Sequence, residues 1–267
     1  LIGHKNSGAV LDDAVPTPCP SIAEARRLAG AGSMLDDMVR MARANAPAQE
    51  IWIMAVAETG SAGTRTITVD SVPSAGAAAI EIAGETVSVT VAAGDTVAAV
   101  ASALAGAINA YFNRLNGASL PYTAAAAAAV VTLTPRHAGA IMNGIDIHVP
   151  TLDGTNVLSG KVTLAAPTAG AGNPDLTSGL AALGDDEFDW IVSPFADATN
   201  IGRYTALLSD VSGRWAWSRQ IYGHVFYPLS DTIANLTSHA LARDNRHLTV
   251  LPIIASSQAP QPVWQWA

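Results

Sequence analysis

The sequence predicts an α/β protein: a mostly parallel sheet with flanking helices, carrying an inserted β-rich (α+β) lobe. In the first and last parts of the chain, apolar strand-like runs alternate with amphipathic helical segments. Between them single apolar and polar residues alternate, as in antiparallel strands with one buried face. Nearly half of the 267 residues are apolar and 13% are charged, so the chain is able to bury a sizeable core. We therefore expect a discontinuous core domain, residues 1–61 plus 167–267, and an inserted β-rich domain with one helix, residues 62–166.

Two capping patterns predict two helices in the first part of the chain. Ser21 is followed three residues later by Glu24, which is the capping-box pattern. Ser33 precedes a second run with apolar residues at helical spacing, which Pro47 ends. The following segment, 51–57, is apolar on both faces, as expected of a central parallel strand.

The middle segment predicts strands interrupted by one helix. Alternating apolar residues on both sides of Gly84-Glu85 predict a hairpin. Asp95 or Thr96 is expected to cap the helix that follows. Further strands are predicted at 130–134 and 145–149, and we assign the preceding alanine run to a hairpin because β patterns surround it.

In the last part, helices and strands alternate again. We expect a short helix at 177–183, then strands at 188–195, 220–227 and 247–254. Two longer helices lie between these strands, the first capped near Asp197 or Thr199 and the second by Ser230 or Asp231. Their expected inward-facing residues are Ile201, Tyr204, Leu207, Leu208 and Val211 in the first, and Ile233, Leu236, Ala240 and Leu241 in the second.

Charge and motif content exclude several classes of function. The net charge is −8 and the 14 Lys and Arg residues are scattered, so we expect no direct nucleic-acid contact. The one cysteine, Cys19, rules out a disulfide within the chain and a Cys-rich zinc site. No apolar run reaches the ~18 residues of a membrane span, so we expect no membrane insertion. The G-x-G of segment 169–176 lacks the third glycine of a dinucleotide site, and we expect no cofactor.

The stretch LGDDEFDWIVSPFAD, residues 183–197, is the best candidate for chemistry. Its first four carboxylates lie at the amino end of the expected strand, where α/β proteins do not place sites; they are Asp185, Asp186, Glu187 and Asp189. Ser193 and Asp197 lie at the carboxyl end of the strand, the favourable end, and with His224 they define an alternative hydrolase-like enzyme. Ser193 has no G-x-S-x-G elbow, however, and Asp197 is explained as a helix cap.

A second candidate is a metal site in segment 145–149. Asp146 and His148 share one face of the predicted strand, but no third ligand is evident, and a solvent face explains both residues. We therefore predict no catalytic, cofactor-binding or metal-binding residue, and no enzyme.

Five stretches, in order along the chain, resemble tail sheath proteins of contractile bacteriophages, in particular the Mu-like group. The resemblance covers most of the chain, although no single stretch is a signature with a mechanism of its own. The stretches are GSMLDDMVRMARANAPAQEIWIMAV, VVTLTPRHAGAIMNGIDI, AGAGNPDLTSGLAALGDDEFDWIVSPFADATNI, GRWAWSRQIYGHVF and ARDNRHLTVLPI.

The resemblance implies a structural subunit that polymerises around a tail tube and contracts to drive the tube through the host envelope. The implied partners are copies of the subunit, the tail tube protein, and baseplate and tail terminator proteins. The implied location is the virion tail, assembled in the bacterial cytoplasm. Family members carry terminal arms that add strands to neighbouring sheets; we expect this chain to be a trimmed fragment without them, monomeric or weakly associating. The second alternative is a virion surface adhesin that binds through segment 62–165.

Overall fold

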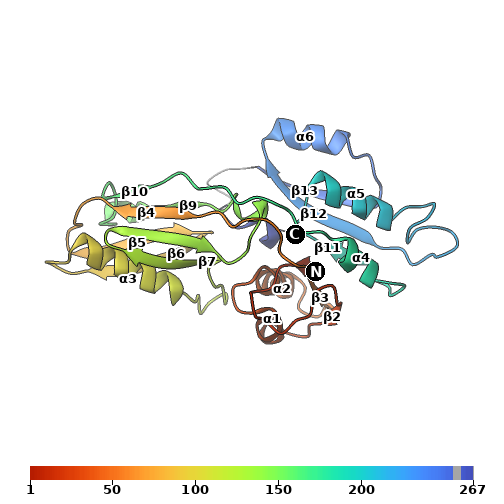
Figure 1. Ribbon diagram of the computed structural model, residues 1–267, viewed down its shortest axis with the longest axis horizontal. Coiled ribbons are helices and arrows are strands. Elements are labelled where there is room, and N and C mark those ends of the chain that lie inside the picture. The colour runs from red at the N-terminus through yellow and green to blue at the C-terminus, as the bar shows by residue number, and fades with distance from the viewer. Residues whose placement is uncertain (255–259, 267) are drawn as a thin grey trace. The chain divides into compact units, whose positions relative to one another are not determined.

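The structure, a computed structural model, describes residues 1–254 and 260–266 and divides into two compact units (Figure 1). Unit 1 is formed by Leu1–Thr59 with the described residues of Asn173–Ala259 and Val263–Ala267. Unit 2 is formed by Gly60–Gly172 with Pro260–Pro262. The described residues contain six α-helices and four sheets, some with parallel strands. The predicted mixed α/β class is confirmed at this level.

The first sheet of unit 1 has the order β1-β3-β2. Strand β3 (Trp52–Ala55) is central, as predicted, and pairs in parallel with β1 (Ile2–Gly3). It pairs antiparallel with β2 (Thr17–Pro18), so this sheet has one antiparallel edge.

Two helices separate β2 from β3, and both predicted caps are confirmed. Helix α1 (Ile22–Ala29) begins after Ser21, whose Oγ accepts a hydrogen bond from the Glu24 N–H at 3.1 Å. Helix α2 (Met34–Asn45) begins after Ser33, whose Oγ accepts from the Asp36 N–H, also at 3.1 Å. The apolar face of α2 is buried, including Met34 and Leu35.

The second sheet of unit 1 is fully parallel, with the order β11-β12-β13. Its strands are β11 (Trp190–Val192), β12 (His224–Asp231) and β13 (Leu248–Ile254). Helices α4 (Thr177–Ala182), α5 (Ala198–Leu207) and α6 (Ile233–Leu241) precede or connect them (Figure 1). A short 3-10 helix, η3 (Val263–Gln265), packs on α2, where the Trp264 indole donates to Asp37 Oδ2 at 3.2 Å.

Strand β11 is shorter than predicted, and β12 is displaced along the chain, from the predicted 220–227 to 224–231, both for local reasons. Pro194 follows β11 closely and has no N–H with which to extend the ladder. Before β12, Gln220 and Tyr222 adopt positive φ angles of 53° and 63°, which no strand accommodates. The strand therefore begins at His224 rather than at Gln220.

The prediction for α6 was wrong in its cap and in most of its inward face. Strand β12 runs through Ser230 and Asp231, so the cap falls to Thr232, whose Oγ1 accepts from the Asn235 N–H at 3.4 Å. Of the four residues expected to face inward, only Leu236 is buried. The exposed three are Ile233, Ala240 and Leu241.

The other long helix, α5, follows its prediction more closely. Asp197 is its cap, and Ile201, Tyr204 and Leu208 are buried. Leu207 is half-buried. The helix ends at Leu207, so Val211 lies beyond it and is 87% exposed, contrary to the prediction.

The described residues of unit 2 contain two antiparallel sheets and one α-helix. One sheet has the order β10-β4-β8-β7 and the other β6-β5-β9, and α3 (Val97–Asn109) contacts strands of both. Thr96 is the cap of α3, while Asp95 accepts from the Ala92 N–H. The strands are β4 (Arg65–Val69), β5 (Gly76–Ile82), β6 (Glu85–Val91), β7 (Tyr122–Ala127), β8 (Val130–Pro135), β9 (Ile147–His148) and β10 (Val162–Leu164).

Both predicted hairpins of unit 2 are confirmed. Strands β5 and β6 pair across a turn at Ala83-Gly84, one residue before the predicted Gly84-Glu85, and the alanine run forms β7, which pairs with β8. Segment 145–149 contributes only the two-residue strand β9, which pairs with the end of β5. Two 3-10 helices, η1 (Ala140–Met142) and η2 (Leu152–Gly154), lie on either side of β9 in the chain.

Candidate functional site

Ser193 is a core hydroxyl in this fold. It follows β11, is fully buried, and its Oγ lies 2.7 Å from the hydroxyl of Tyr204 on α5. The same tyrosine hydroxyl is 3.0 Å from the Phe195 carbonyl oxygen, and burial raises the pKa of Tyr204 well above its ordinary value. The hydrogen bond therefore ties α5 to the end of β11, and the group bonded to the serine is a tyrosine hydroxyl.

Asp197 acts as the cap of α5. Its Oδ1 accepts from the Asn200 N–H at 3.1 Å and its Oδ2 from the Asn200 side-chain amide at 2.7 Å. Both carboxylate oxygens are thus engaged with the first turn of the helix, which is a structural role.

His224 lies away from Ser193, by strand register and by face. It is the first residue of β12 and pairs with Trp190, the first residue of β11, whereas Ser193 follows the carboxyl end of β11. Neighbouring residues of a strand point to opposite faces, so His224 shares its face with Phe226, and Ser193 shares the other with buried Ile191. His224 Nε2 lies 2.8 Å from Thr249 Oγ1. The three residues of the hydrolase-like alternative do not converge.

The acidic turn before β11 surrounds a buried arginine that the sequence reading did not identify. Arg214 is fully buried and donates to the carbonyl oxygens of Gly184 at 3.0 Å, Tyr222 at 3.1 Å, and Asp186. Burial lowers the pKa of the Arg214 guanidinium, and the nearby carboxylates of the turn oppose this effect. The carboxylates of this turn therefore favour the charged form of the buried Arg214, which is a structural role.

A second acidic side chain, Glu81, lies beside the Asp146–His148 pair, and the sequence pattern did not indicate it. His148 Nδ1 lies 2.6 Å from Asp146 Oδ2, and Nε2 lies 3.6 Å from Glu81 Oε2, because β9 pairs with β5. Both imidazole nitrogens therefore face carboxylates. In the part of the chain that the structure describes, no group of three or more His, Cys, Asp or Glu side chains has the arrangement of a metal site.

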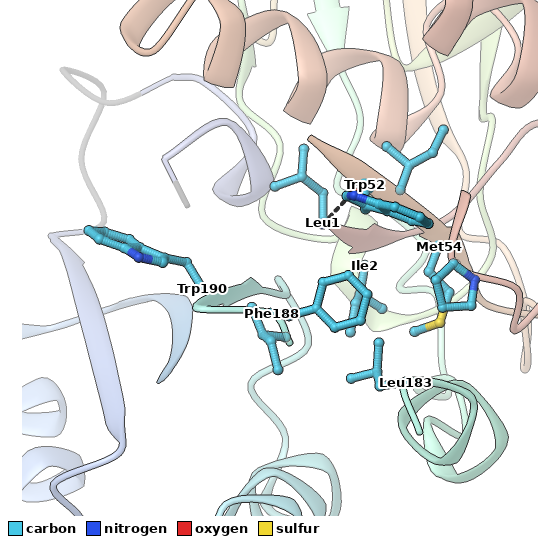
Figure 2. Close-up of a pocket in the computed structure, with 10 residues that line it drawn as sticks. Leu1, Ile2, Trp52, Met54, Leu183, Phe188 and Trp190 are labelled. Carbon is cyan, nitrogen blue, oxygen red and sulfur yellow. Dashed lines mark hydrogen bonds between the residues drawn. The ribbon is translucent and has the colours of Figure 1, made fainter. Parts of the chain in front are cut away.

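A hollow lined by residues of unit 1 is too small for a substrate. It has a volume of about 20 Å³, room for about one water molecule. Its lining is mainly apolar, and Figure 2 shows Phe188 beside Ile2 and Met54, with the Trp190 indole pointing away from these side chains. Within residues 1–254 and 260–266, no helix has the length and apolar character of a membrane span.

Unit 1 offers a strand edge and exposed apolar side chains for contacts with other proteins. Strand β13 is at the edge of its sheet and contains Pro252, a residue that sheets tolerate at such edges. Large apolar side chains are exposed around this sheet and its helices, as is typical of protein contact surfaces. They are Val211 (87%), Trp217 (83%), Leu241 (80%), Trp190 (70%) and Ile233 (64%).

No family model matches this chain. Among curated proteins, the Mu-like prophage FluMu tail sheath protein of Haemophilus influenzae (strain ATCC 51907 / DSM 11121 / KW20 / Rd) is 30% identical to it over 249 residues. The match covers 92% of this chain and 49% of the relative, so the chain spans about half the length of the curated relative that it matches. The predicted resemblance to a Mu-like tail sheath protein is confirmed.

Proposed function

We propose that this chain is part of a structural subunit of a contractile phage tail sheath. The observation that carries the proposal is the 30% identity to a tail sheath protein along 92% of the chain. The name of that relative supports a structural role in a phage tail. The absence of convergence among Ser193, Asp197 and His224 agrees with a role that is not enzymatic.

In this proposal the subunits polymerise around the tail tube and contract to drive it through the host envelope. Residues 1–61 plus 167–267 form a discontinuous core, and residues 62–166 form a domain inserted into it. A mostly parallel core sheet, with helices on its sides, gives each subunit a rigid body. Contraction then changes the contacts between bodies rather than the bodies themselves.

The proposed partners are other copies of the subunit, the tail tube protein, and the baseplate and tail terminator proteins. Subunits that repeat along a helix join unlike patches, because a head-to-tail contact that does not close forms a filament. The exposed edge of β13 and the exposed Trp190, Trp217 and Leu241 offer such patches. The proposed location is the virion tail, after assembly in the bacterial cytoplasm.

Electron microscopy of the full-length protein, expressed alone, tests this function. We expect tubes with the width of a sheath and a regular helical repeat, because contacts between identical subunits are sufficient for polymerisation. Particles that remain single at all protein and salt concentrations would contradict the proposal.

A further inference from the structure

Strand β7 is an edge strand whose own sequence lacks the residues that discourage edge-to-edge pairing. It is the last strand in the order β10-β4-β8-β7. Natural edge strands carry lysine, proline or a bulge that discourages pairing with another chain. Between Tyr122 and Thr134 the sequence has no charged residue and no proline, and the side chains of Ala125, Ala126 and Ala127 are exposed.

One side chain occupies the place of the missing neighbour strand. Asn109, the last residue of α3, donates its Nδ2–H to the Ala124 carbonyl at 2.7 Å and accepts from the Ala124 N–H at Oδ1, 2.8 Å away. A residue of a neighbouring strand makes the same pair of bonds in an antiparallel ladder. Because outward-facing residues alternate along a strand, Ala126 also directs its N–H and C=O away from β8.

The same arrangement recurs in unit 2 where strand partners end. Asn156 donates to the Ala79 carbonyl at 2.8 Å and accepts from the Ala79 N–H at 3.0 Å. It does so on the edge of β5 beyond the two-residue strand β9, which pairs only with Glu81 and Ile82. Asn143 makes both bonds to Gly170, at 3.0 Å and 2.8 Å.

We propose that Asn109 is an edge plug, which closes β7 against antiparallel pairing with β7 of a second copy of this chain. The partner is a second copy because the exposed edge is uncharged and consists mainly of alanine, so two such edges meet without charge repulsion or side-chain clash. The plug acts at Ala124, near the middle of the strand, and interrupts any continuous ladder there.

The test compares Asn109→Ala with the parent chain by hydrogen exchange and sedimentation velocity. Loss of the carboxamide should speed exchange of the Ala124 amide about tenfold, the equivalent of one hydrogen bond. The variant should also associate with rising concentration. Alanine favours helix, so the end of α3 should persist. Asn116→Ala is the matched control: it removes an exposed asparagine that bonds Glu85 and should change neither quantity.

A rescue variant separates edge pairing from general destabilisation. In N109A/A126K, a lysine at the exposed Ala126 position should abolish the association while exchange at Ala124 stays fast. The proposal is overturned if N109A keeps the oligomeric state of the parent, or if A126K leaves its association unchanged. Should circular dichroism show N109A unfolded, Asn109→Ser takes its place with the same two outcomes, because serine is uncharged and its side chain is too short to make both bonds to Ala124.

Discussion

At the scale of the residue, the fold of unit 1 depends on a few polar side chains with many bonds. Arg214 binds the carbonyl oxygens of Gly184, Asp186 and Tyr222, and so joins the acidic turn to the segment that enters β12. Tyr222 needs this support because its φ of 63° costs conformational free energy in a non-glycine residue.

We predict that Arg214→Met lowers the free energy of unfolding by about 3 kcal/mol or more. The substitution leaves three carbonyl oxygens without their charged donor. Arg214→Lys should recover only part of the loss, since an ammonium cannot reach three carbonyls with the geometry of a planar guanidinium. Urea unfolding followed by circular dichroism measures both values. Equal stability of the methionine variant and the parent would refute the role of Arg214.

Two histidines give unit 1 a predicted dependence of stability on pH. Burial lowers the pKa of His224 and of His239 below the ordinary 6.5, and the charges of His247 and Arg243 act in the same direction. As the pH is lowered through 6.5, the histidines of the unfolded chain therefore bind protons at a higher pH than those of the folded chain. The free energy of unfolding decreases as the pH decreases.

The double variant H224Q/H239Q should flatten this dependence. Glutamine keeps a hydrogen-bonding group for Thr249 and Tyr227 but does not titrate. Urea unfolding at pH 7.5 and pH 5.5 should show a smaller loss of stability in the variant than in the parent. An equal loss in both proteins would assign the pH dependence to other groups.

Sequence patterns predicted individual residues well where their effect is local. Ser21, Ser33, Thr96 and Asp197 cap helices because a side chain and the N–H it accepts lie within three residues of each other. The burial and bonding of Arg214 could not be predicted, because its partners lie 8, 28 and 30 residues away along the chain. The partners are backbone carbonyls, which every residue type has. The segment GRWAWSRQ contains two arginines, Arg214 and Arg219, and nothing in its pattern indicates which one is buried.

At the scale of the element, the errors occurred where burial depends on neighbours distant in sequence. The periodicity of α6 correctly predicted a helix, yet Ile233 and Leu241 are exposed. In the same way, the apolar pattern of β13 predicted a strand but not that it lies at an edge. Periodicity reports which residues share a face, and it does not report whether another element covers that face.

The edge of β13 yields a prediction that distinguishes two neighbouring residues. Val225 donates its N–H to the His247 carbonyl, and the alternation of a parallel ladder then directs the Thr249 N–H toward β12 and the Val250 N–H outward. Val250→Pro should therefore remove no ladder bond but prevent a strand from adding at this edge. We expect V250P to fold with near-parent stability and to block tube formation by the full-length protein.

Thr249→Pro is the matched control, since it removes a ladder bond and should lower the melting temperature measured by circular dichroism. Tubes of normal appearance from V250P would show that no strand adds at the β13 edge.

At the scale of the whole molecule, the two units differ in the pairing of their strands. Unit 1 contains all the parallel pairs of named strands in the described residues, and unit 2 is antiparallel. The sequence pattern indicated this difference. Helical and strand-like segments alternate in the first and last parts of the chain, whereas single apolar and polar residues alternate in the middle. What the sequence could not supply was the division of the parallel strands between two three-stranded sheets, because strand order depends on long-range pairing.

The central claim is that this chain works mechanically, through contacts with copies of itself. A helical reconstruction by electron cryo-microscopy, from tubes of the full-length protein, measures this most directly. We expect a wall in which every repeat contains both units and in which a strand from a neighbouring subunit lies along β13. A wall built without these residues, or a protein that forms no tubes, would contradict it.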